Sequence, residues 1–127
     1  MKHLTAEWIE KAEEDFFSAR HLAGAEYRTP YNAICFHAQQ VAEKLLKARL
    51  CEDTIAFPKT HDLRQLLLLL KDAYPDWMCL AERVRRLSFY SVSTRYPGDS
   101  ATREDMEQAL LDMGAVRDHI RASFGLW

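Results

Sequence analysis

Residues 36–48, FHAQQVAEKLLKA, decide the fold of this chain. At about 100° per residue the stretch winds into a helix with two different faces. One face is apolar and needs a core; it carries Ile34, Ala38, Val41, Ala42, Leu45 and Ala48. The adjacent edge aligns four polar side chains at helical spacing, namely His37, Gln40, Lys44 and Lys47. An imidazole, an amide and two ammonium groups in one stripe can bind a phosphate or a nucleobase edge, and a plain solvated face has the same pattern.

The sequence on either side predicts more helices and no strands. Glycine and proline are scarce, and no alternating strand pattern lasts. We expect Thr5 to cap the first helix, Thr60 to cap the third, and Thr102 with Asp105 to form a capping box for the last. The expected helices cover residues 5–25, 31–52, 63–74, 77–90 and 102–124. The prediction is one all-α domain over residues 1–127, an up-and-down bundle of about five helices with the third the most buried.

Bulk properties exclude several classes of function. A net charge of -2 gives no global basic field, so any nucleic-acid site must be a local patch. The apolar run Leu66–Leu70 is far too short to span a bilayer, and no signal peptide is visible at the start. Cys35 and Cys79 are expected to be buried thiols. The histidines are scattered, so we predict no metal and no cofactor, in a cytoplasmic protein without membrane contact.

Four motifs, in this order, resemble the HEPN (higher eukaryotes and prokaryotes nucleotide-binding) domain family. They are Trp8…Ala12…Asp15, residues 36–48, Lys59-Thr60-His61-Asp62-Leu63 and Arg95-Tyr96-Pro97-Gly98. The resemblance covers nearly the whole chain and implies a HEPN-like helical bundle. It also implies a partner: small stand-alone domains of this kind pair with a minimal nucleotidyltransferase, often as a toxin–antitoxin module, and usually dimerise through helices.

Many family members are metal-independent RNases that use an Arg-x4–6-His motif, and this sequence departs from that pattern. The residues four to six positions after Arg95 run from Ser100 to Thr102, and none is histidine. Cleavage by 2′-OH attack needs a base for the hydroxyl proton and a cation for the developing phosphorane charge. The cation is available, but the base at the family's position is missing. The sequence therefore favours a protein that is not an enzyme, and it assigns no catalytic residue.

Further ligand contacts come from loops and from a basic cluster. His61 can contact a phosphate or base, or it can stabilise the start of the third helix. Arg95 can bind phosphate and Tyr96 can stack on a base, held in one geometry by Pro97; alternatively, Tyr96 seals the core edge while Arg95 pairs with an acid such as Glu43. A basic patch or a solvated face explains Arg83, Arg85 and Arg86. Helix geometry puts Arg83 and Arg86 on one face, and Arg85 points elsewhere.

Three functions remain open from the sequence. The first is a non-catalytic nucleotide- or RNA-binding module at the His37, Gln40, Lys44 and Arg95 edge, or the partner subunit of a separately encoded nucleotidyltransferase. The second is a HEPN RNase toxin with an unconventional base, His37 or His61, and Arg95 opposing the phosphorane charge. The third is a purely structural dimerisation partner. The leucine-rich third helix, Trp77, Phe124 and Trp127 give more apolar surface than five short helices bury, which favours a homodimer.

Overall fold

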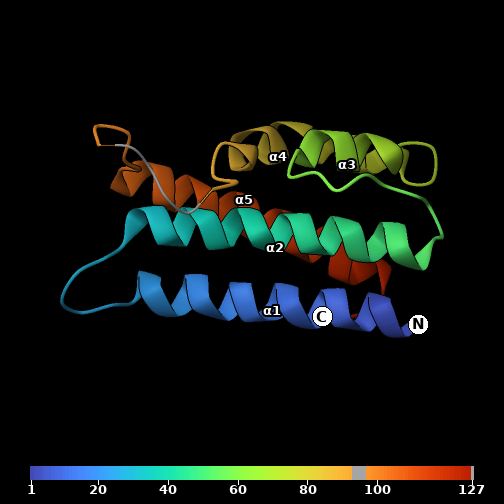
Figure 1. The fold of residues 1–127 in the computed structure, drawn as a ribbon, viewed down its shortest axis with the longest axis horizontal. Helices are drawn as coiled ribbons and strands as arrows, with labels where there is room; N and C mark the ends of the chain where they lie inside the picture. Colours follow the sequence, from blue (N-terminus) through green and yellow to red (C-terminus); the bar gives the residue numbers. More distant parts are fainter. Residues whose placement is uncertain (93–96, 127) are drawn as a thin grey trace.

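The computed structural model describes residues 1–92 and 97–126, and over these ranges the chain is helical with no strand (Figure 1). The described residues form five α-helices and one short 3-10 helix. In chain order they are α1 (His3–Ala23), α2 (Tyr31–Glu52), α3 (Leu63–Leu69), the 3-10 helix η1 (Pro75–Leu80), α4 (Ala81–Ser88) and α5 (Arg103–Ser123). The predicted all-α bundle is confirmed. Among the described residues, no helix is long and apolar enough to cross a membrane.

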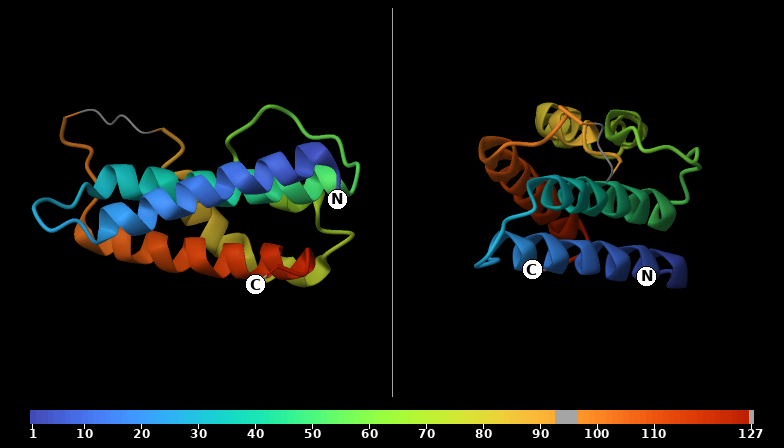
Figure 2. Two further views of the ribbon diagram at one scale, coloured as in Figure 1. Left: turned by 90° about the horizontal axis from the view of Figure 1, so that it is seen from below. Right: turned by 60° about the vertical axis from the view of Figure 1, so that its left-hand side comes forward.

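Helix α2 is the centre of the bundle. It contacts α1, α3, α4 and α5, and it lies between α1 on one side and the α3–α4 layer on the other (Figures 1 and 2). Every residue from Val41 to Leu50 is buried except Lys44, which is partly buried. The sequence predicts one apolar face and one polar edge for this helix. Since neighbouring segments cover much of the polar edge as well, its side chains are buried or half-buried and need partners inside the protein.

The core forms where apolar stripes from the other helices meet α2. Helix α1 contributes Ile9, Ala12 and Ala19, and α5 contributes Met106, Ala109, Met113, Val116 and Ile120. Small alanines on α1 and α2 allow the two helices to pack along their full length (Figure 1). At about 25 cal/mol per Å2 of apolar area removed from water, this shared core is the main stabilising contribution.

Two of the three predicted helix caps differ in the structure. Helix α1 begins at His3, and Thr5 lies buried inside it rather than capping it. Asp62 caps α3 by accepting hydrogen bonds from the backbone N–H groups of Arg64 and Gln65. The Thr60 hydroxyl instead accepts a hydrogen bond from the backbone N–H of Asp62, in the turn that precedes α3. The capping box of Thr102 with Asp105 is confirmed.

The segment after α2 is less helical and less buried than predicted. Helix α3 ends at Leu69, and Leu68 and Leu69 remain 50% and 38% exposed because the helix lies on the surface of α2. The predicted fourth helix is divided into η1 and α4. Trp77 is buried, but Cys79 is exposed, so the expectation of a buried thiol there is wrong. Cys35 is buried as expected.

Candidate functional site

The first half of the polar stripe of α2 binds a carboxylate from α1. Nδ1 of His37 lies 2.8 Å from Oδ1 of Asp15, and the Lys44 ammonium donates to Oδ2 of the same carboxylate. The Asp15 side chain is only 11% exposed. A buried carboxylate needs charged or donating partners, and here both come from one helix face. The positive charges that the sequence offers to a ligand are therefore compensated within the protein.

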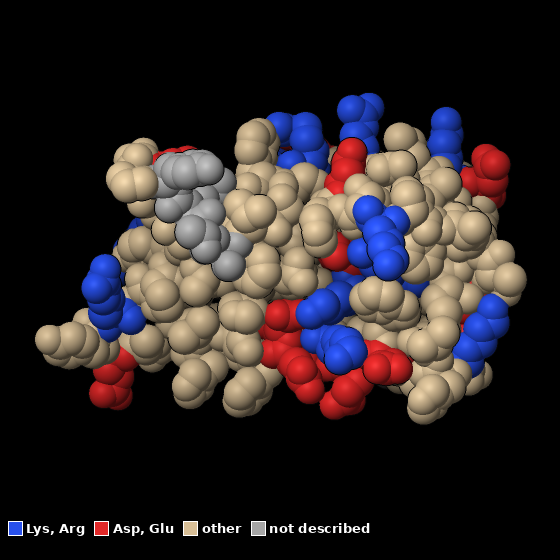
Figure 3. Space-filling view, viewed as in Figure 1, with Lys and Arg blue, Asp and Glu red and all other residues tan. Residues whose placement is uncertain are grey.

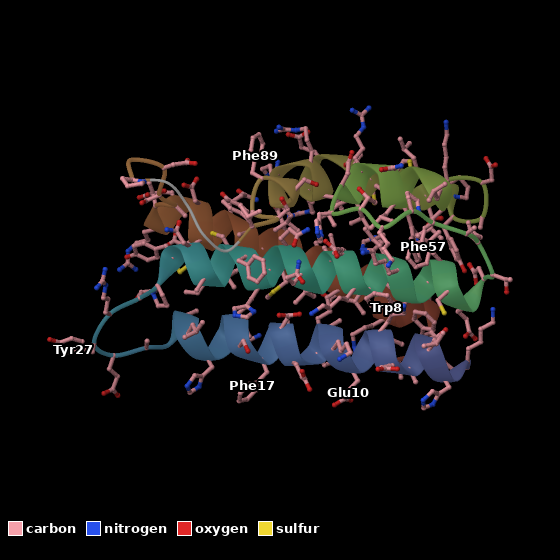
Figure 4. All side chains as sticks on the ribbon, viewed as in Figure 1. Trp8, Glu10, Phe17, Tyr27, Phe57 and Phe89 are labelled. Atoms are coloured by element: carbon pink, nitrogen blue, oxygen red, sulfur yellow. The ribbon has the colours of Figure 1, made fainter. Side chains whose placement is uncertain are left out.

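The second half of the stripe converges on Glu43, which is 4% exposed. Lys47 donates to its Oε2 at 3.0 Å, and Gln39 donates to its Oε1 at 3.0 Å. Gln40 in turn donates to Oε1 of Gln39 at 2.7 Å. The Lys47 ammonium also lies 5.6 Å from the centroid of the Trp8 ring, which sits between α1 and α2 (Figure 4). The ion pair of Glu43 and Lys47 is therefore buried, which differs from the plain solvated face that the sequence also allowed for this stripe.

His61 connects this buried network to the surface. Its Nδ1 lies 2.9 Å from Oε1 of Glu43, while 68% of the His61 side chain is exposed. Burial alone would raise the pKa of Glu43, but hydrogen bonds from Gln39, His61 and Lys47 outweigh it and lower the pKa below 4.5. Glu43 is thus ionised near neutrality, and it fixes the orientation of the imidazole from below.

A cavity of about 450 Å³ opens beside His61. Its lining comes from the start of α3 and the end of α4, and consists of His61, Asp62, Arg85, Ser88, Phe89 and Ser91. Phe89 is 66% exposed and lies at the α4 edge of the bundle (Figure 4). An imidazole, a guanidinium, two hydroxyls and an aromatic ring in one hollow match the groups that bind a phosphate and stack on a base.

The arginine cluster of α4 divides into two roles. Arg83 and Arg86 both donate to Asp112 of α5, whose side chain is 1% exposed. Arg86 is bidentate, with Nε at 2.9 Å from Oδ2 and Nη2 at 2.8 Å from Oδ1. Arg85 points elsewhere, as its helical position predicts, and its exposed side chain pairs with the exposed Glu82. Of the three, Arg85 has the most exposed side chain, at 51% against 38% for Arg83 and 33% for Arg86, and its carboxylate partner is itself exposed.

The predicted site residues therefore fall into two groups around two carboxylates. His37 and Lys44 meet at Asp15, whereas Lys47 and His61 meet at Glu43, which Gln40 reaches through Gln39. Arg95 and Tyr96 lie outside the described residues. Both predicted histidines use Nδ1 to contact a carboxylate of a neighbouring helix, an arrangement that orients the ring.

Sequence reasoning named Asp15 and Glu43 but gave neither of them an organising role, and it did not single out Asp112. Asp15 lies on the α1 stripe between Ala12 and Ala19, and Asp112 lies on the α5 stripe between Ala109 and Val116. An acid on an otherwise apolar stripe is the signal that could have found them, because a buried acid is almost always paired. Glu43 is different: its burial depends on how closely α3 approaches α2, which the sequence of α2 does not show.

The visible face carries no continuous basic field. Figure 3 shows acidic and basic side chains close together in its middle, and Lys and Arg side chains along the α3–α4 edge at the top. Among residues 1–92 and 97–126, no three His, Cys, Asp or Glu side chains are placed to hold a metal ion. A ligand site on this face is thus a small pocket rather than a broad electrostatic surface.

Comparison with known proteins places this arrangement in a family. No curated protein matches the sequence. The fold is similar to the crystal structure of an archaeal HEPN homologue, with 23% identity, a TM-score of 0.73, and coverage of 97% of this chain and 98% of the other. The family model described as HEPN domain matches residues 5–122, a range that includes α1, the α2 stripe and the His61 loop. Because this match covers most of the sequence, the chain belongs to the HEPN domain family.

Proposed function

We propose that this HEPN-domain protein is a non-catalytic binding module for a nucleotide or a short RNA segment. The observation that carries the proposal is the cavity of about 450 Å³ that places His61, Arg85 and Phe89 around one hollow. Arg85 supplies a charge for a phosphate, and Phe89 supplies a ring for a base. Asp62 also lines the hollow, so a ligand must orient its phosphate toward Arg85 and away from that carboxylate.

The sequence-predicted contacts of Arg95 and Tyr96 belong to the same proposal. Ser91 lines the cavity, and Arg95 follows it by four residues in the sequence. The four residues of the α2 stripe have a structural role in this proposal. Through Asp15 and Glu43 they fix the positions of α1, α2 and the His61 loop relative to one another; they are His37, Gln40, Lys44 and Lys47. Whether they also touch a ligand stays a prediction.

A binding titration tests the proposal. A fluorescent short RNA and a nucleoside monophosphate are titrated with the wild-type protein, His61→Ala, Arg85→Ala and Arg95→Ala in modest salt. The matched control is Arg28→Ala, an exposed arginine of the α1–α2 loop. We expect tight binding for the wild type and the control, with at least about tenfold weaker binding for Arg85→Ala. Equal affinities for the wild type and all three cavity variants would show that the proposed site is wrong.

One observation favours an RNase as the second candidate function. The Glu43 carboxylate holds Nδ1 of His61, which leaves Nε2 for proton transfer, and Arg85 supplies a cation in the same cavity. In this alternative His61 is the unconventional base that the missing Arg-x4–6-His motif requires. RNA integrity, checked in the titration samples, separates the two functions. Cleavage by the wild type that is lost in His61→Ala supports the enzyme, and intact RNA supports the binding module.

The protein's partners form the remaining part of the proposal. A minimal nucleotidyltransferase encoded next to this chain, co-purifying with it, would support the role of a partner subunit in a toxin–antitoxin pair. If Arg85→Ala changes neither ligand nor partner binding, a purely structural dimerisation partner is the better description. Cytoplasmic localisation is part of the same proposal, because nucleotides and RNA are the expected ligands.

A homodimer is proposed through the α1–α5 side. A hollow of about 590 Å³ between these helices is lined by four apolar side chains and four charged ones, namely Phe16, Leu110, Leu111 and Met113 with Arg20, Glu107, Arg117 and Asp118. Leu111 of this lining is 66% exposed, and Phe17 of α1 is 70% exposed and points away from the bundle (Figure 4). Exposed apolar residues gathered near one hollow are typical of an interface. Trp77 and Phe124, which the sequence suggested for this role, pack against the core instead. Trp127, the third such aromatic residue, lies outside the described residues.

A further inference from the structure

A cysteine and a histidine meet on the surface at the junction of η1 and α5, well outside the residues that line the ligand cavity. Sγ of Cys79 lies 3.8 Å from Nε2 of His119, and both side chains are exposed. Cys79 belongs to η1 and His119 to α5, so 40 residues of sequence separate them. The contact depends on the packing of η1 against α5 and would not survive unfolding.

The tautomer of His119 follows from its second contact. Nδ1 lies 3.1 Å from the backbone carbonyl oxygen of Ala115, one turn earlier in α5. A carbonyl oxygen only accepts hydrogen bonds, so Nδ1 carries the ring hydrogen and Nε2 presents a lone pair. The Cys79 thiol therefore donates to Nε2. The result is a thiol, a base within reach of its proton, and a third group that orients the base, which is the arrangement of an activated nucleophile.

The other two cysteines provide a contrast within the same chain. Cys35 is fully buried in the core, and Cys51 is half-buried at the end of α2. Cys79 combines exposure with a basic partner, the two features that make a thiol reactive. None of the sequence motifs that define the bundle needs a cysteine at this position, and the fold does not bury it.

We propose that Cys79 and His119 form a thiol-modification site that reacts with low-molecular-weight disulfides. In the reaction, the Cys79 sulfur attacks one sulfur of the disulfide while Nε2 of His119 takes the thiol proton. A new S–S bond joins Cys79 to one half of the reagent, and the old S–S bond breaks. The other half leaves as a thiolate and receives the proton from the His119 imidazolium. The product is a mixed disulfide on the surface, and a free thiol reverses it by the same exchange.

The test compares modification rates at the three cysteines of the intact protein. Wild-type protein and His119→Asn are treated with oxidised glutathione, quenched with acid at intervals and mapped by mass spectrometry. His21→Asn is the matched control, because His21 is also exposed on a long helix but stacks on Phe17. The same reagent is applied to the wild type in concentrated urea, where every thiol is fully accessible.

The expected result has two parts. Cys79 should react faster in the folded protein than in urea. Exposure alone could make the folded-state rate at most equal to the rate of the fully accessible thiol in urea, so a faster rate requires activation by His119. His119→Asn should slow Cys79 by about tenfold, and His21→Asn should leave the rate unchanged. Circular dichroism of both variants checks that the helices remain. A folded rate at or below the rate in urea, or a folded His119→Asn with the wild-type rate, would overturn the proposal.

Discussion

Nδ1 of His61 lies 2.9 Å from Oε1 of Glu43, so an exposed wall of the cavity is attached to a buried carboxylate of the central helix. The same carboxylate accepts from Lys47 and Gln39. The loop before α3 is thereby fixed on α2, and the position of His61 follows from the packing of the core. A change at Glu43 should therefore alter both the stability of the bundle and the shape of the cavity.

The acid dependence of stability tests this network. Because the pKa of Glu43 is lowered in the folded protein, its contribution is fully present above pH 4.5 and is lost as the pH falls through the lowered value. In Glu43→Gln the unfolding free energy, measured by urea denaturation, should fall less over this interval than in the wild type. The control Glu10→Gln, an exposed change on α1, should keep the wild-type dependence (Figure 4). A Glu43→Gln curve parallel to the wild type would argue against an ionised Glu43.

A substitution at Lys44 can distinguish a structural role of this residue from a contact with the ligand. Its ammonium binds Asp15, and its side chain is 22% exposed. We expect Lys44→Met to lower the unfolding free energy by about 1–3 kcal/mol, because a buried carboxylate loses a charged donor. RNA affinity should change less than twofold, since the charge is already compensated. A folded variant with normal stability and much weaker RNA binding would show that Lys44 contacts the ligand.

Asp112 should be the acid whose loss costs the most stability. It is almost fully buried and accepts from Arg83, Arg86 and Gln108, so it fixes α4 on α5. Asp112→Ala should lower the unfolding free energy by about 3 kcal/mol. This value is at the lower end of the cost of breaking a buried ion pair, because the two arginine side chains can become hydrated again. Thermal and urea unfolding measure the change. The exposed acid Glu82 is the comparison: Glu82→Gln should have no measurable effect, and a similar loss there would refute the assignment.

The dimer interface proposed at the α1–α5 hollow can be tested by measuring the oligomeric state. Leu111→Glu places a charge beside the proposed interface, where it would be desolvated in a dimer. Sedimentation velocity should show a dimer for the wild type and a monomer for the variant, with unchanged circular dichroism. Leu68→Glu, on the exposed side of α3, is the control and should remain dimeric. A monomeric wild type, or a dimeric Leu111→Glu, would contradict this interface.

Sequence periodicity placed α1, α2 and α5 to within about two residues, but it missed the early end of α3 and the division of the next helix into η1 and α4. It also did not show the partners of the polar side chains. The stripe of His37, Gln40, Lys44 and Lys47 was visible, because a helix repeats at fixed spacing. That the stripe is enclosed could not be read from α2 alone, since it depends on where α1 and α3 pack. For the same reason Thr5, which has the residue type of a cap, is buried within α1.

The site showed the same limit. His61 was identified from its loop motif, but its partner Glu43 lies 18 residues earlier, on helix α2. Arg85 was predicted to point away from Arg83 and Arg86, and it does, because that prediction needed only helical geometry. The cavity itself lies where the start of α3 packs near the end of α4. This tertiary contact could not be predicted from a local sequence pattern.

Amide NMR spectra of the wild-type protein titrated with a short RNA test the central claim most directly, because they show where the ligand lies. We predict that the largest shift changes fall on His61, Asp62, Arg85 and Ser88–Ser91, with the RNA intact at the end of the titration. Shift changes confined to the α1–α5 side, no changes at all, or cleaved RNA would contradict a non-catalytic binding module at this cavity.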